Sequence, residues 1–141
     1  SGMEAKFSKL PRGLRNNNPL NLRISSSAWQ GKITPNSDGS FEQFKTLEYG
    51  IRAAMVNLRT LISRDHIERV ADIIYKWAPP SDNNNTEKYI ERVCEIASVG
   101  RSDRILAANR TQVCRLLWAM AQVECGQVVP YSSFEKAWLM I

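Results

Sequence analysis

The sequence has few of the residues that build metal sites and disulfide frameworks. Its 141 residues include three cysteines and one histidine. Cys94, Cys114 and Cys125 show no CxxC spacing, and His66 stands alone. We therefore expect reduced and mostly buried thiols, no metal site and no cofactor.

Long apolar runs are also absent. No stretch approaches the ~20 apolar residues needed to span a bilayer. No charged segment followed by an apolar one marks a signal peptide near the start of the chain. We therefore expect a protein that is made in the cytoplasm and has no membrane span.

Gly/Ser linkers and low-complexity blocks are missing as well, which favours a single folded domain. Hydrophobic residues make up 43% of the chain and charged residues 23%, the balance of a globular protein. Residues 1–3, SGM, resemble a cloning remnant, so residues 1–10 are set apart as this remnant and a flexible amino terminus. Residues 11–141 are expected to form one domain.

The charge is moderately positive and favours an anionic partner without naming it. Lys and Arg number 19 against 14 Asp and Glu, a net charge of +5. Nucleic acid, an acidic membrane and a bacterial wall polymer all fit this sign. The basic residues are spread along the chain without a Lys/Arg-rich run, so nucleic acid is the weaker expectation.

Apolar periodicity predicts about five helices behind an irregular amino-terminal part. Residues 11–45 are rich in Asn, Ser, Gly and Pro, which indicates loops with a small hairpin. Beyond them, apolar residues recur at offsets of three and four, as in amphipathic helices. The fold class expected is mainly α, within α+β. The predicted helices cover about 47–63, 67–77, a segment after SDNNNT that ends near 100, 110–126, and a short closing segment 136–141, with one helical turn at 102–108.

Capping residues and breakers set the predicted helix ends. Thr46 and Asn109 are suited to helix starts, and Gly126 is suited to a left-handed helix end. The prolines of WAPP at 77–80 stop the second helix. Ser132 and the glutamate three residues later have capping-box spacing before the closing helix.

One acidic residue lies where the helical pattern calls for an apolar one. Glu124 follows Met120 by four residues and Leu117 by seven, so it shares their buried face. An apolar environment and the negative end of the helix dipole both raise a carboxyl pKa. This is the environment of a general acid, as for the glutamate of lysozyme. The alternatives are that Glu124 frays into solvent or pairs with Arg115.

Two further acids are weaker candidates for a second catalytic carboxylate. Asp38 lies in the turn SDGS, where a turn role explains it equally well. Glu42 lies between Phe41 and Phe44, close in sequence to the asparagine-rich segment RNNNPLNLR at 15–23.

Several strings together resemble one family. They are RGLRNNNPLNLR at 12–23, WQG at 29–31, DGSFEQF at 38–44, EYGIRA at 48–53, WAPP with a later NNT and Tyr at 77–89, and ECGQ followed by PYS at 124–132. Small phage and prophage proteins carry RNNNPGNIR, W-x-G, F-x-x-F, GIRA, WAP-x-x-x-N-x-T and ENGQ-x-PYS in this order. They are usually described as virion structural proteins, and their catalytic variants are associated with lysozyme-like muramidases and lytic transglycosylases.

The resemblance implies cleavage of peptidoglycan glycan strands, with Glu124 as the acid. A lysozyme-like domain usually has its catalytic helix first, whereas here the helix with Glu124 comes late, so the fold would be circularly permuted. Two residues depart from the family pattern: Leu20 replaces Gly, and Cys125 replaces Asn. The implied delivery to the bacterial cell wall is by a virion, by secretion or by release at lysis, with other virion or secretion components as partners.

Amide and arginine side chains are the expected sugar ligands. Each amide offers donors and an acceptor to acetamido and hydroxyl groups, and Arg binds carboxylates. Turn and cap roles explain part of the asparagines, and the aromatic candidates fit either stacking on sugars or the core. The expected substrate-binding residues are Arg15, Asn16, Asn17, Asn18, Asn21, Arg23, Trp29, Gln127 and Tyr131.

Two other functions fit the same sequence. A virion or wall-binding module would keep the sugar-binding surface without turnover. A small DNA-associated helical protein would account for the net charge and would bind DNA with a steep salt dependence.

Overall fold

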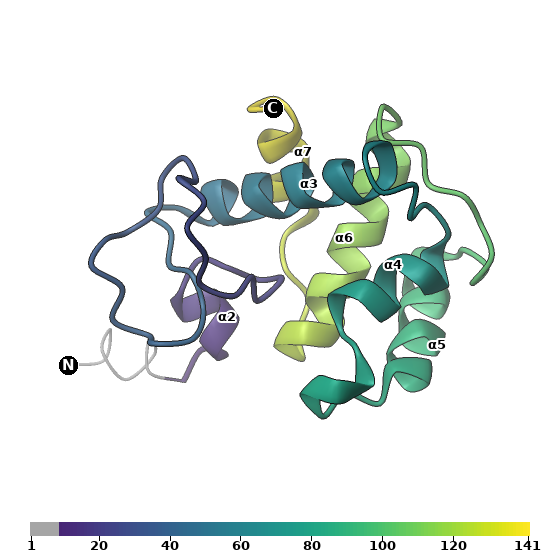
Figure 1. The fold of residues 1–141 in the computed structure, drawn as a ribbon, viewed down its shortest axis with the longest axis horizontal. Coiled ribbons are helices and arrows are strands. Elements are labelled where there is room, and N and C mark those ends of the chain that lie inside the picture. Colours follow the sequence, from purple (N-terminus) through teal and green to yellow (C-terminus); the bar gives the residue numbers. More distant parts are fainter. Residues whose placement is uncertain (1–8) are drawn as a thin grey trace.

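The structure, a computed structural model, describes residues 9–141. The expected remnant and flexible amino terminus therefore lie almost wholly outside the described residues. The described chain is mainly α-helical, as predicted (Figure 1). Its helices are α2 (Arg12–Arg15), α3 (Leu47–Ser63), α4 (Val70–Trp77), the 3-10 helix η1 (Pro80–Asp82), α5 (Thr86–Ala97), α6 (Arg110–Cys125) and α7 (Tyr131–Trp138).

The two longest helices begin at the predicted caps. The Thr46 side chain accepts a hydrogen bond from the backbone of Tyr49 at 3.3 Å, and α3 follows it. Asn109 accepts one from the backbone of Gln112 at 3.0 Å, and α6 follows. Gly126 ends α6 with φ 69°, a left-handed conformation that glycine adopts at little cost.

The predicted amino-terminal hairpin is replaced by isolated bridges. Arg23 pairs with Phe41, and Lys32 pairs with Phe44, with no continuous strand among the described residues. A side-chain amide adds to the backbone bonds between the two segments, such as the one from Glu42 to the Leu22 carbonyl at 2.9 Å. Asn18 donates to the backbone carbonyls of residues 22 and 42 at 2.9 and 3.0 Å. It also accepts from the backbone of residue 22 at 2.9 Å. A buried asparagine therefore joins the two segments that a hairpin would have paired.

Two predicted local structures differ. Residues 102–108 form no helical turn, because their backbone pairs with the start of α4, where Val70 donates to the carbonyl of Asp103 at 3.0 Å. The closing helix α7 begins after Pro130, so Ser132 lies inside its first turn and is not the cap. Glu135 instead forms an ion pair with Arg110 at 2.8 Å. The short helices α2 and η1 were not predicted.

Helix α6 is the centre of the main core. It packs against α3, α5 and α7, and its buried face includes Leu117 and Met120, both fully buried. Figure 1 shows the carboxyl end of α6 between the amino-terminal loops and the pair α4 and α5. None of the helices between residues 9 and 141 is long and apolar enough to cross a membrane.

The turn at 15–23 is held between α3 and the end of α6. Leu20 is fully buried in the main core. The thiol of Cys125 donates to the carbonyl of Pro19 at 3.5 Å. On the other side the turn lies directly on Gly50 of α3, where a Cβ would overlap the carbonyl oxygen of Asn17. These contacts fix the turn against the end of α6.

We expect Gly50→Ala to destabilise the protein by at least about 2 kcal/mol, because the overlap with the Asn17 carbonyl forces α3 and the turn apart. In a helix, alanine is favoured over glycine by about 1 kcal/mol, so without the overlap the substitution would stabilise the protein. Urea unfolding followed by circular dichroism measures the change. Arg59→Ala, at an exposed position of α3, is the control and should stay within about 0.5 kcal/mol of the wild type. A Gly50→Ala variant as stable as the wild type would contradict the close packing.

Candidate functional site

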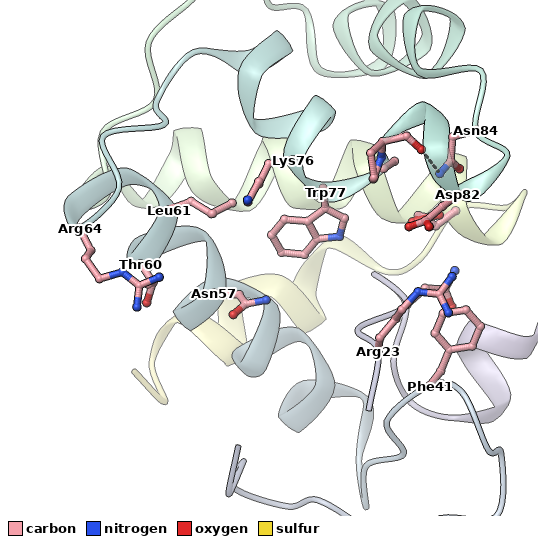
Figure 2. A pocket seen from close by; sticks show the side chains of 14 residues that line it. Arg23, Phe41, Asn57, Thr60, Leu61, Arg64, Lys76, Trp77, Asp82 and Asn84 are labelled. Carbon is pink, nitrogen blue, oxygen red and sulfur yellow. Dashed lines mark hydrogen bonds between the residues drawn. The ribbon is translucent and has the colours of Figure 1, made fainter. Parts of the chain in front are cut away.

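A cleft of about 480 Å³ opens where α3, the end of α4, η1 and the amino-terminal turn meet the end of α6. We call it the main cleft. Figure 2 shows Trp77 near its middle, with residues of α3 on one side and Arg23 with Phe41 on the other. The residues that line it are Asn21, Arg23, Phe41, Asn57, Thr60, Leu61, Arg64, Lys76, Trp77, Ala78, Pro79, Asp82, Asn84 and Glu124.

A second cleft of about 340 Å³ adjoins the first and is called the side cleft. Both clefts are lined by Asn84 and Glu124, so these two residues lie at their junction. The side cleft is otherwise formed by α5, the turn before it and one residue of α6. These residues are Asn83, Asn85, Lys88, Tyr89, Arg92 and, from α6, Val123. Main and side cleft together form a groove with Glu124 between its halves.

The Glu124 carboxyl group has the altered acidity that its position in the sequence predicts. Burial raises its pKa from 4.5 to about 7, and a hydrogen bond from the Asn21 side chain acts in the opposite direction. Glu124 lies in the last turn of α6. Its described hydrogen-bond partner is Asn21 and not Arg115. The structure therefore favours neither fraying of Glu124 into solvent nor its pairing with Arg115.

Asn21 reaches Glu124 because of its backbone conformation. Its φ is 52°, a left-handed value that asparagine tolerates better than most residues. The neighbouring Gly13 makes room for the side chain, since a Cβ on Gly13 would lie 3.0 Å from the Asn21 amide oxygen. With its oxygen facing Gly13, the amide presents its nitrogen as the donor to Glu124.

The other three asparagines of the turn build the loops. Asn16 and Asn18 are buried. Asn17 donates to the carbonyl of Phe44 at 3.0 Å, and Asn16 donates to Asp38 at 2.9 Å. Of the four asparagines predicted as ligands, the structure therefore brings Asn21 to the groove.

Arg23 is the other predicted ligand that lines the main cleft. Its guanidinium lies over the Phe41 ring, 5.1 Å from the centroid. Arg15 is exposed and lines neither cleft.

The remaining predicted ligands lie away from both clefts. Trp29 packs beside the small cluster of Leu22, Phe44 and Ala53. Tyr131 contacts Trp118 edge to face, with centroids 5.8 Å apart. Gln127 is exposed beyond the end of α6.

The two candidates for a second carboxylate are engaged elsewhere. Asp38 accepts two hydrogen bonds from Arg12 at 2.6 and 2.8 Å, which hold the pKa of its carboxyl well below the usual range. Glu42 is fully buried and pairs with Lys32 at 3.0 Å. Neither residue lines a cleft. Within residues 9–141, the carboxylate that lines the main cleft beside Glu124 is Asp82.

Sequence reasoning missed Trp77 and Asn84. The indole nitrogen of Trp77 donates to the carbonyl of Leu20 at 3.1 Å, which fixes the ring against the turn. Asn84 donates to the carbonyl of Pro79 at 3.1 Å (Figure 2). The string WAPP followed by NNT could have indicated that both residues belong to the site. The spacing of Trp77, however, is equally typical of a core residue.

Both departures from the family pattern are accommodated by packing. The Leu20 side chain is in the core, and its carbonyl holds Trp77. The Cys125 side chain is buried, and burial raises the pKa of its thiol to about 11. Neither side chain lines the groove.

No group of His, Cys, Asp or Glu side chains suited to a metal ion occurs in the part of the chain that the structure describes. The groove offers amides, cations, an indole and a proton donor. These are groups that bind and act on a polar, partly anionic ligand.

Fold and groove together define a small, mainly α-helical domain with a buried carboxyl group between two polar clefts. No model of a known protein family matches the chain. The sequence is 38% identical over 124 residues to Protein P5 of Pseudoalteromonas phage PM2, an alignment that covers 86% of this chain and 75% of that protein. The chain belongs to the family of this phage protein.

We expect the carboxyl carbon of Glu124 to titrate with a pKa of about 7 when followed by NMR of glutamate-labelled protein. Asn21→Gly removes the donor at a position whose positive φ suits glycine, so the pKa should rise further. Asn57→Ala removes another amide of the main cleft and should leave the titration unchanged. A pKa near 4.5 in the wild type, or a fall in Asn21→Gly, would contradict this environment.

The raised pKa of Glu124 also predicts how stability depends on pH. The pKa of Glu124 is about 7 in the folded protein against 4.5 for the free group, so the folded state holds the proton more tightly. Its contribution is complete below pH 4.5 and is lost as pH rises through 7. The free energy of unfolding of Glu124→Gln minus that of the wild type should therefore be higher at pH 8 than at pH 4, by up to about 3 kcal/mol. Urea unfolding at both pH values measures it. An equal difference at the two pH values would contradict the shift.

Proposed function

We propose that this member of a phage protein family cleaves the glycan strands of peptidoglycan, as a muramidase or lytic transglycosylase. The observation that carries the proposal is the Glu124 carboxyl group, which has a pKa of about 7, lies between the two clefts and accepts a hydrogen bond from Asn21. A peptidoglycan strand bound in this groove would place one of its bonds beside this group.

The two influences on Glu124 suit the two stages of acid catalysis. Burial keeps the carboxyl group protonated before reaction, so it can donate its proton to the glycosidic oxygen of the leaving sugar. The carboxylate that remains is stabilised by the hydrogen bond from Asn21. It can then take a proton from the attacking hydroxyl group or water.

Side chains of the main cleft suit an N-acetylated sugar. Asn57 and Asn84 offer donors and acceptors to acetamido and hydroxyl groups. Trp77 offers an aromatic surface held in place by its bond to the Leu20 carbonyl. Arg23 offers a positive charge to a lactyl or peptide carboxylate.

Asp82 is the main-cleft candidate for a second acidic group. As a base it would direct water to the anomeric carbon and give a reducing product. Attack by a hydroxyl group of the substrate would instead give an anhydro product and needs no second carboxylate. The two outcomes differ by the mass of one water in the released sugar.

The order of elements fits a permuted lysozyme-like domain. The loop segment comes first in the chain, and the helix with the acid comes late, yet the turn and the acid lie together at Asn21 and Glu124. Phage family membership supports delivery to the bacterial wall by a virion, by a secretion system or at lysis.

A non-catalytic role in the virion or on the wall is the second candidate. The observation that favours it is the similarity to a phage protein, because membership of that family does not by itself imply catalysis. Such a protein would bind glycan strands in the same groove and release nothing.

Glu124→Gln separates the two functions. We expect the wild type to release muropeptides from purified sacculi, with a rate that falls about tenfold per pH unit above pH 7 as Glu124 loses its proton. Glu124→Gln should lower the rate by at least about 100-fold, because the general acid is lost. Mass spectrometry of the soluble products measures both.

Glu91→Gln, at an exposed position of α5, is the matched control and should keep the wild-type rate. Sacculus binding without released products by the wild type would establish the non-catalytic role. An unaffected Glu124→Gln variant would exclude Glu124 as the acid.

A further inference from the structure

The side cleft carries a compact positive charge on one helix. Lys88 and Arg92 are exposed, lie one turn apart on α5 and both line this cleft. The acid that faces them in the cleft is Glu124, whose raised pKa of about 7 leaves it with less than a full negative charge at neutral pH. The cleft therefore favours a ligand with negative charge.

The positive charge of the side cleft is open to a ligand. The ion pair of Arg92 with Glu95 measures 3.4 Å between exposed side chains, a kind of pair that contributes little in water. In the main cleft, by contrast, Arg64 makes two bonds to Asp65 at 2.8 and 3.1 Å.

The side cleft also lacks the aromatic surface of the main cleft. Its aromatic residue among the described lining is Tyr89, which is 6% exposed, and the Tyr89 hydroxyl donates to the carbonyl of Met120 at 3.5 Å. No ring face is therefore offered to a sugar there. Trp77 offers such a face in the main cleft.

Three consecutive asparagines complete the side cleft. Residues 83–85 line it from the turn that leads into α5, where the Asn85 side chain caps the helix by accepting from the backbone of Lys88 at 3.2 Å. Asparagine amides can pair with both the N–H and the C=O groups of a peptide. Amides together with cations are the groups that recognise an extended chain bearing carboxylates.

We propose that the side cleft binds the peptide stem of peptidoglycan, with Lys88 and Arg92 on stem carboxylates and the asparagines on its backbone. The main cleft then holds the sugars, and Glu124 lies where the two parts of the ligand diverge. This assignment rests on the proposed function. It makes the protein selective for strands that still carry their peptides.

The test compares two substrates. Glycan strands are prepared with their stems and, after amidase treatment, without them, and each is incubated with the protein. We expect the wild type to cleave stem-bearing strands with a KM about three- to tenfold lower, the range expected for two exposed charge contacts. In the Lys88→Gln/Arg92→Gln double variant the two KM values should become equal.

The matched control removes the same charge elsewhere. Arg59→Gln/Lys136→Gln changes two exposed cations that line neither cleft and should retain the preference. Equal KM values in the wild type, or a double variant that keeps the preference, would overturn the proposal.

A binding measurement separates failure of the inference from failure of the proposed function. Affinities of Glu124→Gln for both strand preparations are measured by calorimetry. If the wild type cuts neither preparation, the proposed function fails, and the affinity ratio then decides the side-cleft assignment in the same way. Absence of binding to either strand would overturn both. Duplex DNA binding that the Lys88→Gln/Arg92→Gln variant loses, with strand affinities unchanged, would assign these cations to nucleic acid and overturn the proposal.

Discussion

The hydrogen bond between Asn21 and Glu124 joins the amino-terminal loops to the end of the central helix. Each partner depends on a different part of the chain. Asn21 is presented by a turn that rests on Gly50 of α3, and Glu124 is fixed by the apolar packing of α6. The groove exists because both supports are present. A change in the turn or in the packing of α6 therefore alters the pKa of Glu124 without any direct contact with its carboxyl group.

The polar loops and the apolar helices meet through backbone acceptors. Trp77 and Cys125 come from different helices, and both donate to carbonyl groups of the same turn, at residues 20 and 19. Carbonyl groups that a regular strand would pair are satisfied here by side chains. This explains how an irregular segment can form a fixed wall of a binding site.

Features set by local sequence were predictable, and features set by distant partners were not. The phase of Glu124 on α6 follows from spacing alone, because a helix fixes which residues share a face. The engagement of Asp38 by Arg12 and of Glu42 by Lys32 depends on loop geometry that no periodicity encodes. Trp77 shows a further limit, since a helix that packs on a core and also borders a cleft has the same apolar spacing.

The burial of the thiols has a consequence for redox chemistry. Desolvation raises the pKa of Cys94, Cys114 and Cys125, so each is almost wholly in the thiol form at neutral pH. The thiolate is the form that attacks disulfides and reacts with oxidants. The thiol of Cys125, which donates to the Pro19 carbonyl, is therefore poorly reactive towards disulfides and oxidants at neutral pH.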